Sequence, residues 1–576
     1  MPSAGWSSQQ NRKANVMNPE QPSKERSNDH EARPFLGGGE REAEPCVRVS
    51  QEMSVTPIQT LYDRAARNQN DTAFIAADDK WTFKQFAAEV HRVAHGLAAR
   101  GIRKGDRIAL HLPNCPELAV ALYACFHIGA IAVPVNNRFK TPELKAMLRR
   151  LQPALYVGHA DLYGQVRALS STIVPPERCY ITGSNGDDGL AQRWTDLQKD
   201  LLRDIPMSLP ASSDIHAPAV LLTTSGTTGS PKFVIHTLST LAASAESLRY
   251  FELDGTQTVI IACPMVHAIG LFTFIGCVRH GARMVLFKRF DANAVLDGIE
   301  QHGCSWQVGL PFMFAAMLEA QRLRRRNVET LRFCVSAGDI CPPQLQRAFG
   351  IEFGVPLRST WGTTEAMACL TYGLQPGPVS RIAPGTQVRL VEDAGATVSR
   401  GEVGELLLRG PNVSVGYWGG PGVIEGAPKD GWYHTGDLMR QDASGNLWFM
   451  GRKKDIIIRG GSNISPVEVE AVLTSHPAVR DAAVVGIPDD TLGRRVIGFV
   501  QLEHDAPSEI VNEILDAART QLADYKMPER LQVVSSIPRN GLGKIDRKAL
   551  LAVTAHAGHG AVSQDEGRRS LLASSS

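Results

Sequence analysis

The chain has 576 residues and a formal net charge of +2, and 43% of its residues are apolar while 21% are charged. This length exceeds what one hydrophobic core supports, so we expect several packed units with the composition of a globular enzyme. A charge this close to zero argues against a nucleic-acid partner, because nucleic-acid-binding domains are usually strongly basic.

The cysteines and the apolar runs exclude further classes of protein. The ten cysteines contain no CxxC pair, so their spacing encodes neither a disulfide framework nor a structural zinc site, and we expect a reducing, cytoplasmic compartment. No apolar run approaches the roughly 20 residues that span a bilayer, and we expect no integral membrane segment. The N-terminus also lacks the basic-then-apolar order of a secretory signal.

Organised sequence begins only after residue 52. Residues 1–52 are polar and have no apolar period, so they predict a disordered N-terminal extension. From residue 82 onward, Phe86, Val90, Val93 and Leu97 have helical spacing, and Gly101 is a typical residue to end that helix.

Strands and helices then alternate. We expect a helix over 116–126 and strands over 107–114, 131–136, 219–224, 259–264 and 282–287. Apolar strands that alternate with helices predict parallel sheets with both faces covered.

The second half of the chain has a different pattern of predicted elements. Between about residues 385 and 450, short strands separated by glycine turns predict a small β-barrel or another antiparallel unit. After Gly451 we expect a compact α+β module, with helices over 465–473 and 508–522 and strands over 482–486, 496–503 and 531–534.

The segment TTSGTTGSPK, residues 223–232, directly follows a predicted buried strand. Backbone amides in a tight loop at such a position can converge on an anion. Two glycines permit close approach, four hydroxyl side chains add donors, and a lysine adds positive charge; these residues are Thr224, Ser225, Gly226, Thr227, Thr228, Gly229 and Lys232. The spacing differs from the P-loop GxxxxGK[ST]. By composition alone, an ordinary surface loop rich in Ser, Thr and Gly is an equally good interpretation.

Six further segments occur in order along the chain: PMVHAIGL (264–271), STWGTTEA (359–366), GELLLRGPNVSVGYW (404–418), WYHTGDL (432–438), GRKKDIIIRGGSNISPVEVE (451–470) and PRNGLGKIDR (538–547). Together with residues 223–232, they make the chain resemble the adenylate-forming superfamily of acyl- and aryl-CoA ligases, adenylation domains and luciferases. The resemblance covers about residues 55–550.

The resemblance implies an α/β fold with a large N-terminal domain, built from two doubly wound sheets and a small β-barrel, and a smaller mobile α+β C-terminal domain. The boundaries that we expect are 1–52 for the disordered extension, 53–453 for the AMP-binding domain, 454–553 for the mobile domain and 554–576 for a disordered tail. Lys454 matches the hinge between the two domains.

The resemblance also implies a nucleotide site. Glu365 and Thr224 would hold the Mg²⁺ of ATP, and Thr364 would contact the α-phosphate within a motif that also contains Gly362 and Thr363. Trp361 would stack on adenine, where tyrosine is commoner in the family, beside the small-residue loop Ser336, Ala337 and Gly338. Asp437 would accept the ribose hydroxyls, and Arg452 would reach the ribose or a phosphate. Taken singly, a Glu, an Asp or an ion-paired Arg is more often a surface residue.

Three further positions would serve the chemistry. Lys544 would bridge the attacking carboxylate and the α-phosphate, although a lysine in a glycine-rich loop usually faces solvent. His267 would guard the carboxylate pocket, although an isolated histidine is usually structural. Gly460 and Gly461 would let the pantetheine arm of CoA pass beside the backbone, although an ordinary turn looks the same.

The implied enzyme is an AMP-forming acid–thiol ligase that uses ATP, Mg²⁺ and CoA to activate a fatty or aryl acid through an acyl-adenylate. Residues 264–271 lack the aspartate that pairs with the amine of an amino acid, which favours an acid without an α-amino group. The alternative is a stand-alone adenylating enzyme that loads an acyl carrier protein. A non-catalytic protein that uses the fold to sense an acyl-adenylate or a fatty acid is the rival from another class, and the presence of Lys544, Glu365 and Asp437 argues against it. The acid and a homo-oligomeric state stay open.

Two local features complete the predictions. Phe233 stands where the family usually has glycine, so we expect a stiffer or differently packed exit from the 223–232 loop. The basic stretch at 322–327 is most simply a solvated helix end, with a contact to the 3′-phosphate of CoA or to an acyl carrier protein as the second interpretation.

Overall fold

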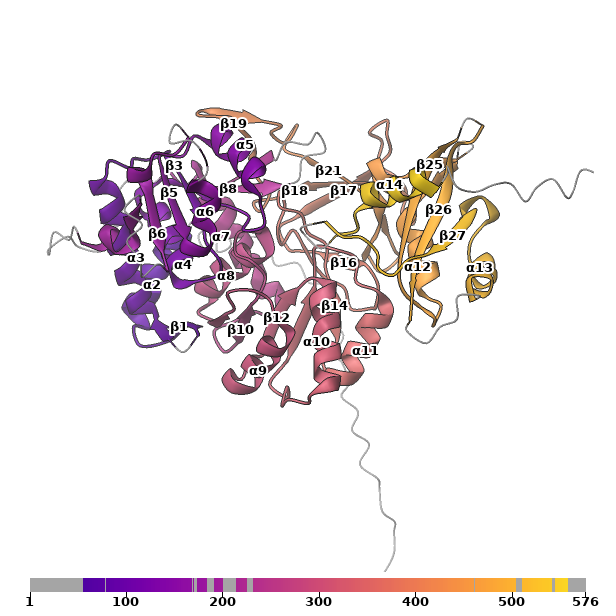
Figure 1. Cartoon of the computed structure of the whole chain (residues 1–576), viewed down its shortest axis with the longest axis horizontal. Helices are drawn as coiled ribbons and strands as arrows, with labels where there is room; N and C mark the ends of the chain where they lie inside the picture. The colour runs from indigo at the N-terminus through magenta and orange to yellow at the C-terminus, as the bar shows by residue number, and fades with distance from the viewer. Residues whose placement is uncertain are drawn as a thin grey trace, which may run out of the picture. The chain divides into compact units, whose positions relative to one another are not determined.

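The computed structural model describes residues 55–77, 79–167, 169, 173–183, 191–199, 214–224, 232–459, 462–489, 491–503, 510–540 and 544–557. The predicted extension over 1–52, the loop residues 225–229, and Gly460 and Gly461 lie outside the described residues. The elements described below all belong to one compact unit (Figure 1).

The first sheet follows the prediction of parallel strands. In the part of the chain that the structure describes, it has seven strands in the order β14 (Leu357–Ser359), β13 (Phe333–Ser336), β12 (Trp306–Gly309), β10 (Thr258–Ile261), β11 (Arg283–Leu286), β1 (Thr72–Ala76) and β2 (Asp79–Thr82). All neighbours pair in parallel except β1 and β2.

The second sheet is larger and mixed. Its nine strands within the described ranges are β20 (Val423–Glu425), β19 (Gly416–Gly420), β9 (Lys232–Thr237), β8 (Pro218–Thr224), β4 (Ile131–Pro134), β3 (Arg107–His111), β5 (Leu155–His159), β6 (Cys179–Thr182) and β7 (Gln192–Arg193). The strands from β8 to β7 are parallel, whereas β9, β19 and β20 add on as antiparallel neighbours.

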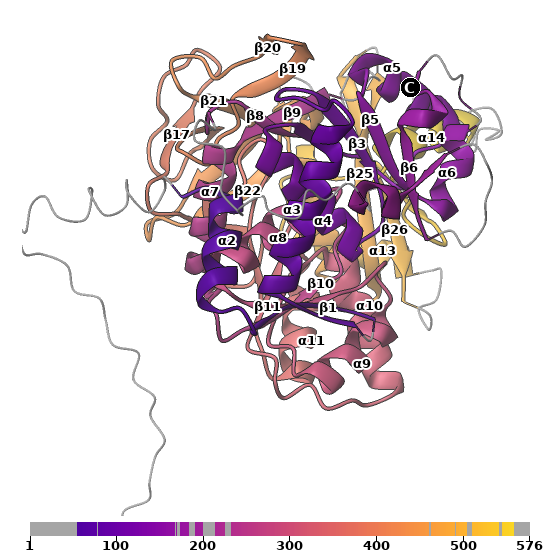
Figure 2. The same cartoon turned by 90° about the vertical axis from the view of Figure 1, so that its left-hand side faces the viewer.

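Helices cover both faces of both sheets, as predicted. One buried apolar cluster joins the two sheets through α2 (Pro57–Arg67), α3 (Phe83–Ala99), α4 (Pro116–Ile128), α7 (Leu238–Ser247) and α8 (Ala268–His280). Figures 1 and 2 show α2, α3, α4 and α8 side by side. The outer faces are covered by α9 (Ala292–His302), α10 (Pro311–Leu323) and α11 (Pro343–Phe353) on the first sheet and by α5 (Thr141–Leu151) and α6 (Ala160–Arg167) on the second.

The segment over 223–232 connects two strands rather than a strand and a helix. Thr224 ends β8 and Lys232 begins β9, and the two residues are register partners of an antiparallel ladder. The loop therefore emerges from a hairpin with a hydroxyl and an ammonium side chain at its base. Phe233, the departure from the family pattern, is buried in the core under β9, and the Arg150 guanidinium lies 5.4 Å from its ring centroid.

The strands predicted between about residues 385 and 450 pair in an antiparallel manner, as expected, but their sheet already begins at Leu370, and β19 and β20 of this region join the second sheet instead. Six described strands pair in the order β15 (Leu370–Tyr372), β16 (Val379–Ile382), β22 (Leu447–Arg452), β21 (Tyr433–Gln441), β18 (Val403–Arg409) and β17 (Gln387–Val391). Every neighbouring pair in this sheet is antiparallel.

The C-terminal segment is the predicted α+β module. Its described strands are β23 (Ile457–Arg459), β24 (Ser462–Ile464), β25 (Val479–Asp489), β26 (Gly493–Leu502) and β27 (Arg530–Val533), and its helices are α12 (Pro466–Thr474), α13 (Val511–Arg519) and α14 (Arg547–Ala557). The last helix crosses the boundary that we expect at residue 553. None of the helices in the described ranges is long and apolar enough to cross a membrane.

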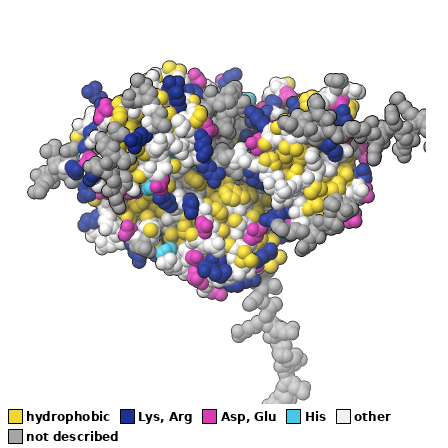
Figure 3. Space-filling model, viewed as in Figure 1, with side chains coloured by type: hydrophobic (Ala, Val, Ile, Leu, Met, Phe, Trp, Pro, Cys, Tyr) yellow, Lys and Arg dark blue, Asp and Glu magenta, His cyan; other side chains and the backbone are white. Residues whose placement is uncertain are grey.

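The prediction of a solvated helix end over 322–327 is wrong for Arg326. Only 1% of its side chain is exposed, and its guanidinium donates to the carbonyl oxygen of Ala320 (3.0 Å) and forms an ion pair with Asp297 (2.9 Å). Arg324 beside it is exposed, so one arginine of this stretch is structural while its neighbour is solvated. Over the face shown in Figure 3, cationic and anionic side chains are interspersed.

Candidate active site

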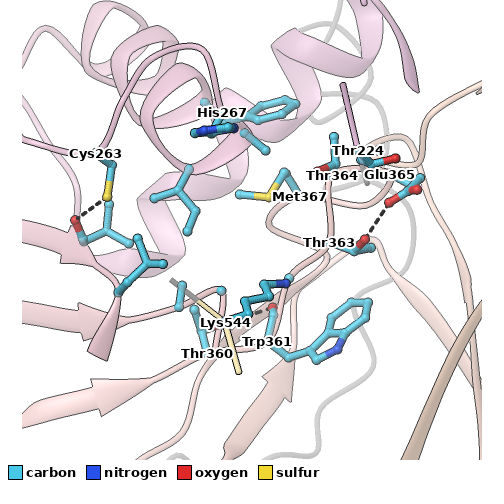
Figure 4. Close-up of a pocket in the computed structure, with 18 of the residues that line it drawn as sticks. Thr224, Cys263, His267, Thr360, Trp361, Thr363, Thr364, Glu365, Met367 and Lys544 are labelled. Atoms are coloured by element: carbon cyan, nitrogen blue, oxygen red, sulfur yellow. Dashed lines mark hydrogen bonds between the residues drawn. The ribbon is translucent and has the colours of Figure 1, made fainter. Parts of the chain in front are cut away.

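A cavity of about 1020 Å³ opens at the carboxyl ends of the parallel strands β10, β12, β13 and β14. Ligands of open α/β sheets bind outside the carboxyl ends of the strands, because the following loops converge there. The six-stranded sheet and the segment that carries Lys544 supply further walls, as Figure 4 shows for part of the lining.

Most of the described residues that the sequence singles out line this one cavity: Thr224, Lys232, His267, Ala337, Gly338, Trp361, Gly362, Thr363, Thr364, Glu365, Asp437, Arg452 and Lys544. Lys454, at the predicted hinge, lines it as well. Ser336, the last residue of β13, does not line the cavity, and its side chain is fully buried. The tertiary structure thus gathers residues that are up to 320 positions apart, from Thr224 to Lys544.

Glu365 is held in place by two hydroxyl groups. Its Oε1 accepts a hydrogen bond from Tyr417 (2.9 Å) and its Oε2 accepts one from Thr363 (2.5 Å), and only 8% of the residue is exposed. The Lys232 ammonium lies 4.8 Å from the ring centroid of Tyr417. Tyr417 lies in the segment GELLLRGPNVSVGYW, but nothing in its spacing pointed to the carboxylate.

The oxygen atoms around Glu365 fit a hard divalent cation such as Mg²⁺, which prefers carboxylate, hydroxyl and phosphate ligands. The described residues contain no cluster of three or more His, Cys, Asp or Glu side chains that could hold a metal on its own. A single carboxylate is sufficient where the nucleotide phosphates supply the other ligands. Glu365 and Thr224 are the residues that would hold the cation.

Asp437 contacts two other predicted nucleotide residues, Arg452 and Trp361. It is a register partner of Arg452 on the neighbouring strand, which explains their separation of fifteen residues along the chain. Its Oδ1 pairs with the Nε of Arg452 (3.1 Å), and its Oδ2 accepts a hydrogen bond from the indole Nε1 of Trp361 (2.9 Å). Burial raises the pKa of Asp437, while Arg452 and Trp361 oppose this shift. The carboxylate therefore orients the Trp361 ring.

Lys544 extends into the cavity beside Thr360 and Trp361 (Figure 4). Its backbone closes a short turn with Asn540, because the Asn540 N–H donates to the Lys544 carbonyl oxygen (2.8 Å) and the Lys544 N–H donates to Asn540 Oδ1 (3.2 Å). Burial lowers the pKa of Lys544, and the Arg452 guanidinium lowers it further. Nearby carboxylates stabilise the ammonium and oppose the shift; they belong to Asp339, Asp437 and Glu365.

Asp339 is the last residue of the predicted small-residue loop SAGD (336–339), and the sequence assigned it no role of its own. Its Oδ2 lies 3.5 Å from the Nη1 of Arg539, and Arg539 also donates to Asp481 (2.6 Å). Burial raises the pKa of Asp339, and the Lys544 ammonium is the first of the charges that oppose the shift. The loop after β13 is therefore connected to the segment that carries Lys544.

His267 is the N-cap residue of α8 and lies on the opposite side of the pocket from Lys544, with Met367 between them (Figure 4). Burial lowers the pKa of His267 to about 4, and the positive charge of Arg138 contributes to the shift. The imidazole is consequently neutral at physiological pH and acts as a hydrogen-bonding group rather than as a cation.

Comparison with known proteins identifies the family to which the chain belongs. The chain matches the AMP-binding enzyme model over residues 61–418 and the AMP-binding enzyme C-terminal domain model over residues 468–544. The chain belongs to the AMP-binding enzymes. Within this adenylate-forming superfamily it falls in the branch of the AMP-forming acid–CoA ligases, as its curated relatives indicate.

Those relatives act on different acids. An indoleacetate–CoA ligase of Aromatoleum aromaticum is 31% identical, and the alignment covers 81% of this chain and 91% of the relative. A long-chain-fatty-acid–CoA ligase of Bacillus subtilis is 30% identical, with 85% of this chain and 93% of the relative covered. The crystal structure of the anthranilate CoA ligase AuaEII with anthranoyl-AMP matches with a TM-score of 0.78 and 27% identity, covering 88% of this chain and 98% of that one.

Proposed function

We propose that the chain joins an apolar carboxylic acid, without an α-amino group, to free CoA in two steps that use ATP. In the first step a carboxylate oxygen attacks the α-phosphorus of ATP, and the bond to pyrophosphate breaks. In the second step the CoA thiolate attacks the acyl carbonyl, and AMP leaves. The acyl-adenylate that links the two steps is a reactive mixed anhydride, so it needs a site that excludes water when it is closed.

The observation that carries this proposal is the position of the Lys544 ammonium in the same cavity as Glu365 and Asp437. A cation placed there stabilises the negative charge that develops between the carboxylate and the α-phosphate. When bound, Mg²⁺ supplies neutralisation of the phosphate charge as pyrophosphate departs. Asp437 and Trp361 orient the nucleoside, and neutral His267 accepts or donates a hydrogen bond at the carboxylate end of the pocket.

The test is carboxylate-dependent exchange of labelled pyrophosphate into ATP over a panel of fatty, aryl and amino acids. We expect exchange with apolar acids and none with amino acids. Lys544→Ala should slow the exchange about 10²- to 10³-fold, the usual effect of removing a transition-state donor. Lys548→Ala, at an exposed lysine of α14, is the matched control and should keep the wild-type rate. Exchange at full speed in Lys544→Ala would contradict the proposal.

Three cationic side chains favour free CoA as the acyl acceptor over a carrier protein. Arg138, Lys288 and Arg289 line the same cavity and are exposed, as a site for the phosphates of CoA requires. The discriminating experiment compares CoA, pantetheine and a phosphopantetheinylated carrier protein in the second step. Arg289→Ala should raise KM for CoA and leave KM for pantetheine unchanged. A carrier protein that outcompetes CoA would favour the alternative function.

A further inference from the structure

The cavity continues past the nucleotide residues into a deep arm along β12 and α8. On β12, Val308 and Trp306 line the arm, and residues two positions apart in a strand share one face. Gln307 between them faces the other way, where its Nε2 lies 3.4 Å from the Met317 sulfur on α10. The arm therefore lies on one face of the sheet only.

Helix α8 forms the opposite wall. The cavity is lined by two pairs of residues four positions apart, Ala268 with Phe272 and Ile269 with Thr273, which lie on one helix face. Because α8 follows β10 and β10 is parallel to β12, α8 runs in the direction opposite to β12. The path from His267 to Thr273 along α8 and the path from Gly309 to Trp306 along β12 therefore lead the same way. The arm is thus a slot between a helix and a strand.

Both walls give the same depth. Three residues of β12, from Gly309 to Trp306, span about 10 Å at 3.3 Å per residue. Six residues of α8, from His267 to Thr273, span about 9 Å at 1.5 Å per residue. The arm therefore reaches about 9 to 10 Å beyond the carboxylate end that His267 marks.

Trp306 closes the bottom of the arm. It is 1% exposed, its indole Nε1 donates to the carbonyl oxygen of Phe251 (2.8 Å), and its ring stacks on Phe333 at a centroid distance of 5.5 Å and an angle of 10°. These contacts fix the ring, so the floor does not yield to a longer ligand without repacking.

The walls near the floor carry no ionised side chain among the lining residues that the structure describes. The lining residues that share a core cluster with Trp306 include Leu248, Phe251 and Ala368. The hydroxyl of Thr273 is already satisfied, because it donates to the carbonyl oxygen of Ile269 (2.7 Å). A polar or charged ligand end would lose its hydration here without compensation. The arm suits an apolar tail.

We propose that this arm measures the acyl chain and that the preferred substrate is an unbranched medium-chain fatty acid of about eight to ten carbons. An extended polypeptide advances about 3.6 Å over the three backbone bonds of a residue, which is about 1.2 Å per bond. At the same advance per bond, an extended acyl chain of about eight bonds fills about 10 Å. The inference rests on the proposed acid–CoA ligase function, and it names Trp306 as the residue that ends the pocket.

The first experiment measures kcat/KM for pyrophosphate exchange with unbranched acids from butanoate to hexadecanoate, together with cinnamate and phenylacetate. Each added methylene should raise kcat/KM about fourfold until the arm is full, since burying one CH₂ contributes about 0.8 kcal/mol. Beyond about ten carbons the value should fall steeply, because the floor is closed. An optimum at six carbons or fewer, an optimum at fourteen or more, or a preference for the aryl acids would overturn the assignment.

The second experiment tests the two ends of the arm. Trp306→Leu lowers the floor and should move the optimum to acids at least two carbons longer. Val308→Phe fills the arm at mid-depth and should move the optimum to shorter acids. Met317→Leu, on the opposite face of β12, is the matched control and should leave the optimum unchanged, since volume-conserving core changes are well tolerated.

Melting temperatures establish that each variant is folded, and Val308→Phe tests the arm even where Trp306→Leu is unstable. An unchanged optimum in both folded variants would remove Trp306 and the arm from the chain-length choice. The experiments distinguish failure of the ligase function from failure of the measuring arm. Absence of exchange with every acid would reject the ligase function, whereas exchange with acids of another length or shape would reject only the measuring arm.

Discussion

At the scale of single residues, Lys544 is defined by its surroundings rather than by its type. Burial and the Arg452 guanidinium lower its pKa, and three carboxylates limit the shift. A lysine with a lowered pKa loses its proton at a lower pH than an ordinary lysine. The fraction of free enzyme that carries a charged Lys544 therefore begins to fall at a lower pH than it would for an ordinary lysine.

We expect kcat/KM for ATP in the exchange reaction to fall on the alkaline side at a pH below the ordinary lysine range, because kcat/KM reports the ionisation of the free enzyme. The kcat limb should lie higher, since bound phosphates stabilise the ammonium. Lys544→Arg should be slower but should lose this alkaline limb, because arginine keeps its charge. A limb that persists in Lys544→Arg would assign the ionisation to another group.

Tyr417 allows a sharper test of the Glu365 site. Tyr417→Phe removes the hydrogen bond to Glu365 and keeps the ring next to Lys232. We expect KM for magnesium ATP to rise about tenfold, since a hydrogen bond to a charged group contributes about 1.5 kcal/mol. Tyr525→Phe, at an exposed tyrosine, is the control. Equal KM values for Tyr417→Phe and the wild type would show that this bond does not position the carboxylate.

At the scale of elements, Arg326 connects two helices. It donates to the carbonyl oxygen of Ala320 at the end of α10, and it bonds to Asn293 (2.6 Å) and Asp297 (2.9 Å) on α9. The Ala320 carbonyl oxygen also accepts a hydrogen bond from the Arg324 N–H (3.0 Å), so the buried guanidinium of Arg326 is a second donor there and holds the end of α10 against α9.

The two neighbouring arginines provide a matched pair for stability. Arg326→Ala should lower the free energy of unfolding by about 1.5 to 3 kcal/mol, because it removes the hydrogen bonds of a buried guanidinium and the packing of its side chain. Arg324→Ala removes an exposed ion pair to the same Asp297 and should cost less than about 1 kcal/mol. Urea titration followed by circular dichroism measures both, and similar losses in the two variants would contradict the structural role of Arg326.

At the scale of the whole molecule, Asp339 and Arg539 join segments 200 residues apart. Asn540, which closes the turn of Lys544, comes directly after Arg539, so the ion pair fixes the turn at the site. The arrangement described here is the one that brings Lys544 to the nucleotide residues. The rotation about Lys454 that would replace it with residues 460 and 461 stays a prediction.

Asp339→Asn should therefore slow adenylation and spare thiolysis. We expect about a fivefold loss in pyrophosphate exchange, in line with about 1 kcal/mol for a partly exposed ion pair. The rate at which CoA consumes supplied acyl-adenylate should not change. Arg539→Gln should give a similar loss, and the double variant should be no slower than either single one, since the two residues act as a pair. Equal slowing of both half-reactions would argue for a general loss of structure instead.

Most of the regular elements follow from local patterns. The helix predicted from Phe86, Val90, Val93 and Leu97 is α3, which begins with a capping box at Thr82 and ends before Gly101 at a φ of 78°. Such signals act within a few residues, so they are visible in the sequence. Arg326 differs, because its burial depends on the carboxylate and amide groups of another helix.

The sequence by itself determined the alternation of strands and helices, the ordered motifs and the family to which they belong, because apolar period, caps and turn residues act over short distances. Only the tertiary structure decided that Asp437 faces Arg452 and Trp361, that Tyr417 meets Glu365, and that Trp306 of β12 lines the same cavity. These contacts join segments whose separation along the chain carries no period, and they exist because the strands and helices that carry them pack together.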